Sequence, residues 1–181
     1  MKKTSLDEAI EKKYPEKVAL IVTKSKEGKI NVMPAGWFMF TSHEPRMIAV
    51  SVGLKRHTHK LLNQGDEFVV TFPSRQQKKD LLYCGKNSGA DVDKISETDL
   101  KTVPSAKLET PLIDESVACF ECLKKNSTKT GDHTIFSGEI VAAHISEREK
   151  IYTMENWHKK GIEGFKTISE MVDSESIAKE R

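Results

Sequence analysis

Short apolar segments separated by turn residues recur along this chain, and they predict a protein built mainly from strands. The segments are rich in the β-branched and aromatic side chains that strands favour. A Lys-Glu-Gly-Lys turn at 26–29 and a polar turn at 126–132 each join two of them as a hairpin. The expected strands are 18–23, 30–33, 47–52, 68–72, 117–123 and 133–145.

Helical patterns are short, and most fall between the strands. Residues 5–13 combine a helical spacing of apolar side chains with Ser5 in the N-cap position. A second helix is expected at 58–63 with Thr58 as its N-cap, and a third is expected at 75–83. Helices of this length serve as connections rather than as a layer of their own.

The combination of short strands and short helices favours a β-barrel or a sandwich. A doubly wound parallel sheet needs helices of about ten or more residues between all its strands. The strands at 18–23, 30–33 and 47–52 follow one another too closely for that. The polar stretch at 85–107 is long for a connection, and long ordered loops usually border a site or an interface.

Composition and charge narrow the class of protein. The 181 residues contain 29 basic and 27 acidic side chains, and the basic ones are scattered, which argues against a nucleic-acid partner. No apolar run approaches the ~20 residues of a membrane helix. A secretory signal has an apolar segment after its first basic residues, and this N-terminus has none after its two lysines. With three cysteines and no pattern of pairs, we expect a cytoplasmic protein without a membrane partner.

Cys119 and Cys122 do not predict a redox dithiol or a metal site. Three residues of strand span about 10 Å, whereas a disulfide needs Cα atoms within about 7 Å. A zinc site would require two further ligands, and only scattered histidines and Cys84 remain. We therefore expect no bound metal.

The segment Pro34-Ala-Gly-Trp37 directly follows a strand and has the properties of a wall for a flat aromatic ligand. Its small residues would let the backbone approach the polar edge of such a ring. Trp37, Phe38 and Met39 would cover the face of the ring. The alternative is a barrel corner whose aromatic side chains belong to the core.

The segment Lys55-Arg-His-Thr58 lies between a strand and the start of a helix. An arginine fork, a hydroxyl and the N–H groups of a helix start hold phosphates well, and Arg56 and Thr58 supply these groups here. The alternative is a solvated basic turn. An apolar wall a few residues from a cationic cluster suits a ligand with a flat ring and an anionic end, such as FMN.

The segment Gly131-Asp-His-Thr134 opens the last strand. His133 could contact a substrate, a flavin or a nicotinamide, or move a proton near neutral pH. A surface histidine in a hairpin is the more frequent situation, and the residues leave both interpretations open.

Four segments in register resemble the flavin reductase-like, or flavoredoxin-type, FMN-binding proteins. They are NVMPAGWFMFTSHEPRMIAVSVGLKRHTHKLL, GDEFVVTFPS, YCGKNSGADVDK and GDHTIFSGEIVAAHI, within about residues 15–146. The resemblance implies a mainly β fold with connecting helices, an FMN-binding split β-barrel of Greek-key type with about six strands. It also implies a homodimer with the flavin near the subunit boundary. Outside these segments the residues themselves predict an N-terminal helix within 1–14, and a C-terminal extension at 147–181 that docks on the barrel through Trp157 and Phe165.

The resemblance also implies roles for individual residues. His133 matches the histidine of the family's GDHT segment, near where a nicotinamide or substrate would lie over the flavin, which implies a positioning role in catalysis. The positions that match cofactor contacts are Pro34, Ala35, Gly36 and Trp37 along the isoalloxazine, Ser51 and Val52 beside the ribityl chain, Lys55, Arg56, His57 and Thr58 at the phosphate, and Ser88, Gly89, Asp91 and Lys94 in a loop near the site or the dimer contact.

Two positions depart from the family pattern. Pro34 stands where the family commonly has threonine, and proline has no N–H to offer a flavin. Thr71 stands where asparagine is frequent. Both departures concern detailed contacts to the cofactor.

The resemblance implies the function of an FMN-dependent oxidoreductase. Such a protein passes electrons from NAD(P)H or a protein donor through FMN to an acceptor. Two alternatives stay open. One is an FMN-binding electron carrier without intrinsic NAD(P)H activity, and the other is a non-catalytic barrel that binds another phosphate ligand.

Overall fold

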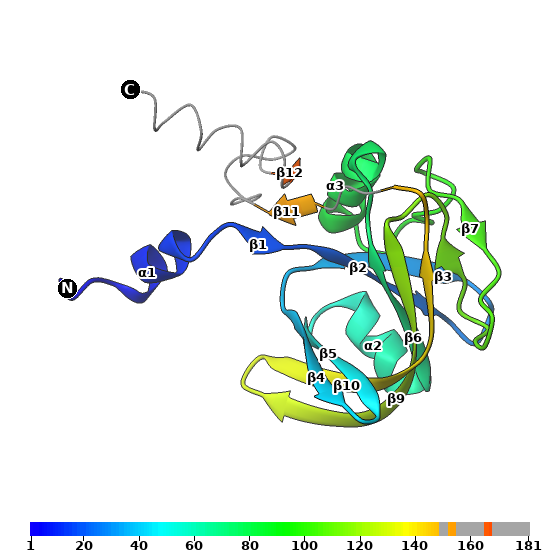
Figure 1. The fold of residues 1–181 in the computed structure, drawn as a ribbon, viewed down its shortest axis with the longest axis horizontal. Helices are drawn as coiled ribbons and strands as arrows, with labels where there is room; N and C mark the ends of the chain where they lie inside the picture. Colours follow the sequence, from blue (N-terminus) through cyan, green and yellow to red (C-terminus); the bar gives the residue numbers. More distant parts are fainter. Residues whose placement is uncertain (149–151, 155–164, 168–181) are drawn as a thin grey trace.

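One curved antiparallel sheet forms the body of the molecule (Figure 1). The computed structural model describes residues 1–148, 152–154 and 165–167. The main sheet has seven strands in the order β3-β2-β6-β9-β10-β5-β4. They are β2 (Ala19–Lys24), β3 (Ile30–Ala35), β4 (Phe38–His43), β5 (Arg46–Gly53), β6 (Glu67–Phe72), β9 (Ala118–Thr130) and β10 (His133–Ile145).

The connections between these strands make the sheet a Greek key. β6, β9 and β10 are successive neighbours, and β5, which precedes them in the chain, lies on the other side of β10. β3 and β4 are the two edges, and no ladder joins them in the described part of the chain. The prediction of a mainly β split barrel is therefore confirmed, with seven strands in the main sheet rather than about six.

Two strands differ from the sequence-based expectation. The pattern predicts no strand between 33 and 47, but residues from Phe38 to His43 pair with β5. The pattern also predicts a turn at 126–132, but β9 continues to Thr130 and leaves only two residues before β10. Both segments are largely exposed, so ladder hydrogen bonds rather than an apolar pattern hold them in place.

The described residues form three α-helices. α1 (Leu6–Lys12) begins after its expected N-cap, Ser5, whose side chain accepts a hydrogen bond from the helix backbone. α3 (Lys78–Lys86) follows a 3₁₀ turn, η1 (Arg75–Gln77), and packs against β3. The helices expected at 5–13 and 75–83 are thus present with small shifts at their ends.

The remaining helix, α2 (His57–Gln64), lies against β2, β3 and β5. Its N-cap is Arg56, so the prediction of Thr58 as the N-cap is wrong. Thr58 lies within the first turn and is buried, and its hydroxyl accepts a hydrogen bond from the side chain of Asn31 on β3 instead of from the helix backbone. This bond fixes the start of α2 against the sheet.

Two apolar cores lie on the two faces of the sheet. One contains Leu20 and Leu81, and the other contains Phe68 and the second half of β5. Cys119 belongs to the first core and Cys122 to the second, which confirms that their side chains face opposite ways. Burial raises the pKa of the Cys122 thiol to about 12, so this group is inert rather than redox-active.

Two carboxylates hold the long excursion between α3 and β9 against the sheet. Glu121 on β9 is fully buried and accepts hydrogen bonds from three successive N–H groups, at residues 106–108. Glu67 on β6 accepts hydrogen bonds from the N–H and the hydroxyl of Thr110. The excursion also contains β7 (Thr102–Val103), paired with β8 (Leu112–Ile113).

The N-terminal arm and the C-terminal extension meet in a second, small sheet. β1 (Glu16–Lys17) pairs with β11 (Tyr152–Met154), which pairs with β12 (Phe165–Thr167). The predicted docking of Trp157 and of the Phe165 side chain lies outside what the structure describes. None of the described helices is long and apolar enough to cross a membrane.

Candidate functional site

Two adjoining cavities open beside the first turn of α2. They share Met33, Pro34 and Arg56 in their walls, so together they form one continuous site. The first has a volume of about 190 Å³ and lies between β3, the start of α2, the end of α3 and the loop that follows α3. The second has a volume of about 200 Å³ and lies between β3, β5 and His133 at the start of β10.

Four basic side chains line the first cavity, which we name the cationic cavity. No carboxylate of the described residues is in its wall. The cavity therefore has an excess of positive charge with no internal compensation. The basic residues are Lys55, Arg56, Lys86 and Lys94.

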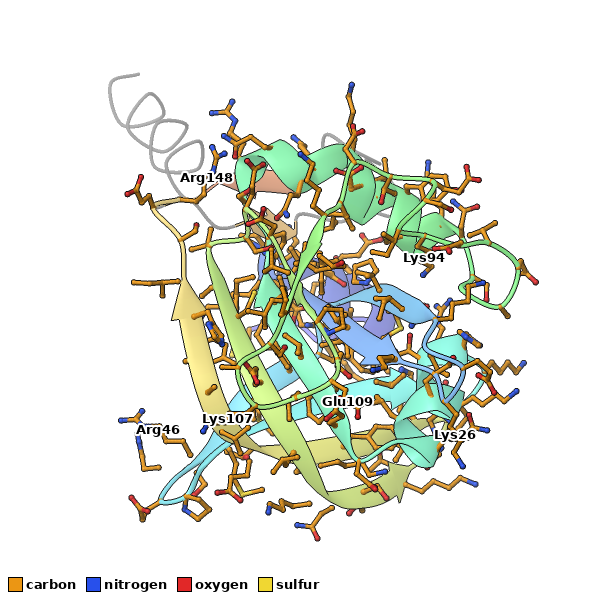
Figure 2. All side chains as sticks on the ribbon, turned by 90° about the vertical axis from the view of Figure 1, so that its right-hand side faces the viewer. Lys26, Arg46, Lys94, Lys107, Glu109 and Arg148 are labelled. Atoms are coloured by element: carbon orange, nitrogen blue, oxygen red, sulfur yellow. The ribbon has the colours of Figure 1, made fainter. Side chains whose placement is uncertain are left out.

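Lys94 is the cation of this cavity with the least access to water, with 3% of its surface exposed. Its ammonium donates hydrogen bonds of 2.7 Å to the carbonyls of Val32 and Cys84, and the residue itself lies in the loop that follows α3 (Figure 2). Burial lowers its pKa, and the nearby Arg56 guanidinium lowers it further. No described carboxylate forms an ion pair with Lys94. Arg56 is exposed to solvent, and its charge adds to that of the buried Lys94 ammonium, so an anion held between the two cations would be stabilised.

The start of α2 adds neutral hydrogen-bond donors to the same cavity. Thr58 is buried, and its hydroxyl oxygen accepts a 2.9 Å bond from the Asn31 amide, which leaves the hydroxyl hydrogen free to donate. Arg56 caps the helix without a side-chain hydrogen bond to it, and the first turn contains no acidic residue. The first N–H groups of a helix have no partner within the helix and favour an anion.

Asn31 was not among the residues singled out by sequence, yet it joins three parts of the site. Its amide nitrogen donates to Thr23 and Thr58, and its oxygen is buried without a partner in the described structure. A Cβ on Gly89 would lie 2.1 Å from that oxygen, so only glycine lets the loop approach this closely. The sequence feature that could have identified Asn31 is its polar side chain within the otherwise apolar strand predicted at 30–33.

His57 faces a strongly cationic environment at the mouth of this cavity. Burial lowers the pKa of its imidazole, and the charges of Lys60, Lys29 and Lys94 lower it further. The same positive field that disfavours an imidazolium favours a bound anion.

Aromatic and small residues line the second cavity, which we name the aromatic cavity. The Trp37 and His133 rings lie 4.9 Å apart at an angle of 37°. The Nδ1 atom of His133 lies 2.7 Å from the Asp132 carboxylate, and this bond lowers the pKa of Asp132. With Nδ1–H donating to Asp132, the Nε2 atom of His133 is left to contact a ligand.

The structure brings nearly all the sequence-predicted residues together. The aromatic cavity is lined by Pro34, Ala35, Gly36, Trp37, Ser51, Val52 and His133. The cationic cavity is lined by Lys55, Arg56, His57, Thr58, Ser88, Gly89 and Lys94. Asp91 is exposed and lines neither cavity.

The predicted aromatic wall is smaller than expected. Trp37 lines the aromatic cavity, but Phe38 packs on Phe72 with ring centroids 5.4 Å apart, and Met39 is 61% exposed. Both residues belong to β4, whose successive side chains point to opposite faces, so Phe38 turns to the core and Met39 turns to the outside. Pro34 lies on an edge strand, where the missing N–H is tolerated.

Comparison with known protein families identifies the family to which the chain belongs. A model of the flavin reductase like domain matches residues 12–163. The chain belongs to the flavin reductase-like family. The matched segment includes every residue that lines either cavity.

Individual relatives agree with this assignment. An uncharacterized protein of Archaeoglobus fulgidus is 39% identical over 128 residues, which cover 71% of each chain. An FMN-binding protein from Thermus thermophilus, solved with bound 1-cyclohex-2-enone, is 25% identical with a TM-score of 0.76, over 86% of this chain and 90% of that one. A flavoredoxin from Methanosarcina acetivorans is 26% identical with a TM-score of 0.75, over 86% of each chain.

The environment of His57 predicts how stability depends on pH. Because the folded-state pKa lies below the ordinary value of about 6.5, the unfolded chain binds more protons in this range. The free energy of unfolding should therefore fall as the pH is lowered from 7.5 to 5.5, and His57→Gln should reduce that loss. Urea unfolding in a phosphate-free buffer measures it.

His43, which is exposed on β4, provides the matched control. His43→Gln should keep the pH dependence of the original protein. A His57→Gln variant with the full original dependence would contradict the assignment of this loss to His57.

Proposed function

We propose that this protein binds FMN and acts as an oxidoreductase of the flavin reductase or flavoredoxin type. It would pass electrons from NAD(P)H or a protein donor through FMN to an acceptor. The observation that carries the proposal is the buried Lys94 ammonium beside Arg56, in a cavity continuous with an aromatic one.

The donors present fit a flavin phosphate. Arg56 and Lys94 supply charge, the Thr58 hydroxyl supplies a free hydrogen, and the start of α2 supplies N–H groups. The unpartnered Asn31 oxygen supplies an acceptor that a ribityl hydroxyl would satisfy. If the phosphate lies in the cationic cavity, the isoalloxazine ring would occupy the adjoining aromatic cavity.

The chain's own groups would bind and orient rather than react. Bound FMN supplies the hydride and electron chemistry. Trp37 and the small residues before it bound the space for the ring, and Pro34 offers no N–H there. His133, oriented by Asp132, would place a nicotinamide or a substrate through its Nε2 atom.

The named relatives support the cofactor more than the reaction. The Thermus protein is named as FMN-binding and the Methanosarcina protein as a flavoredoxin. The electron donor and the acceptor of this chain are therefore proposals. An FMN-binding electron carrier would use the same residues, and it differs from a reductase in that NADH and NADPH do not reduce its flavin.

We also propose that the protein is a cytoplasmic homodimer. Its three cysteines are free and buried, which suits a reducing compartment. Trp37, Met39 and Phe40 lie at or on the edge strand β4 and are 53%, 61% and 56% exposed. An exposed apolar edge beside the aromatic cavity is the kind of surface that a second subunit covers.

Removing the guanidinium should weaken FMN binding. Arg56→Ala is expected to cost about 1.5–3 kcal/mol, the size of a charge-assisted hydrogen bond. Arg46→Ala is the matched control, because Arg46 is exposed in the β4–β5 hairpin and lies well away from Lys94 (Figure 2). Fluorescence titration with FMN measures both variants, and equal affinities for them would remove Arg56 from the site.

Mixing the FMN-loaded protein with NADH or NADPH tests the proposed reaction. Rapid loss of the visible flavin absorbance is expected in a stopped-flow experiment, and His133→Ala should slow it at subsaturating nucleotide. Flavin that stays oxidised with both nucleotides, but is reduced by dithionite, would identify an electron carrier instead.

A charge on the edge strand should dissociate the proposed dimer. Met39→Asp would place two unpaired carboxylates in a symmetric interface and raise the dimer dissociation constant by about 100-fold or more. Ile145→Asp, at an 88% exposed apolar position of β10, should leave the dimer intact. Sedimentation velocity at micromolar concentration measures both, and a monomeric original protein would refute the proposal.

A further inference from the structure

The N-terminal arm contributes one residue to the aromatic cavity. Tyr14 lies between α1 and β1, is half-buried, and lines this cavity together with Met33 and Pro34. Every other described residue that lines the cavity belongs either to the continuous stretch from β3 to the start of α2 or to β10. Among the residues that the structure describes, Tyr14 is therefore the one wall of the cavity that does not come from the main sheet and its connections.

The arm that carries Tyr14 is not held by its own helix. α1 contains no buried residue, and its Leu6 side chain is 75% exposed. The backbone contact that follows Tyr14 is the pairing of β1 with β11, in which Lys17 lies opposite Thr153. β11 belongs to the C-terminal extension and is the middle strand of the small sheet.

We infer that Tyr14 is a positioning residue for the flavin ring, and that the C-terminal extension sets its place through the β1–β11 pairing. An aromatic side chain at the wall of a flat cavity adds contact with a planar ligand at a small cost in side-chain entropy. This inference rests on the proposed function. It gives the extension a role in ring binding that is independent of the phosphate contacts.

A purely structural role for Tyr14 is the alternative, since its ring also packs against the core that contains Val18 and Leu20. The two roles make different predictions for partial ligands. Lumiflavin has the ring system without the ribityl phosphate, whereas inorganic phosphate tests the cationic cavity alone. A ring contact affects only lumiflavin, and a general loss of structure affects both.

The test uses full-length variants at two positions. Tyr14→Ala should weaken lumiflavin and FMN by the same factor, about 3- to 10-fold, and leave the affinity for inorganic phosphate unchanged. Tyr14→Phe, which keeps the ring, should bind like the original protein. A proline in a middle strand removes ladder hydrogen bonds, so Thr153→Pro should reproduce the effect of Tyr14→Ala, and Thr153→Ala should not.

The double variant Tyr14→Ala/Thr153→Pro decides whether the two positions act as one. Its loss of lumiflavin affinity should equal that of either single variant, because both remove the same wall. Faster amide exchange at Lys17 in the Thr153→Pro variant checks that the β1–β11 pairing is broken.

Three results would overturn the inference. Unchanged lumiflavin binding by Tyr14→Ala would remove Tyr14 from the ring site, and an equal loss of phosphate binding would show a structural role. If Thr153→Pro breaks the β1–β11 pairing but leaves the affinity for lumiflavin unchanged, the C-terminal extension has no role in ring binding. Failure of the original protein to bind FMN would instead overturn the proposed function, so the two failures are distinguishable.

Discussion

The buried ammonium of Lys94 is the interaction on which the rest of the site depends. Its two hydrogen bonds tie the loop after α3 to the carbonyl of Val32 on β3 and to that of Cys84 in α3. A lysine that binds only carbonyls keeps its charge uncompensated in a place with little water. The fold thus buries a cation that no described carboxylate neutralises, which is a stability cost typical of binding sites.

The neighbouring polar groups follow from the same constraint. Asn31 lies on β3 one residue before Val32, and its amide donates a hydrogen bond to the hydroxyl oxygen of Thr58, which lines the cavity. Gly89 lets the loop close over Asn31 without a clash. The start of α2, the edge strand β3 and the loop are therefore fixed relative to one another before any ligand binds. A preorganised cavity of this kind binds an anion at little cost in conformational entropy.

The sequence predicts what local chemistry determines and misses what distant partners determine. The buried strands were predictable from their apolar residues, and the cavity residues from motifs that lie close together in the chain. β4 and the end of β9 were not predictable, because hydrogen bonds to β5 and β10 hold exposed residues there. Thr58 as an N-cap was wrong because Asn31, far away in sequence, binds its hydroxyl. Asn31 and Tyr14 were missed for the same reason, since only the folded chain brings them to the cavities.

The central claim is that the cationic cavity exists to hold the phosphate of a flavin whose ring occupies the adjoining cavity. Isothermal titration of the unmodified protein with FMN and with riboflavin, which differ only in the phosphate, tests it most directly. One charge-assisted hydrogen bond is worth about 1.5–3 kcal/mol, so FMN should bind at least about 10-fold more tightly than riboflavin. Equal affinities for the two flavins, or no binding of FMN, would contradict the account.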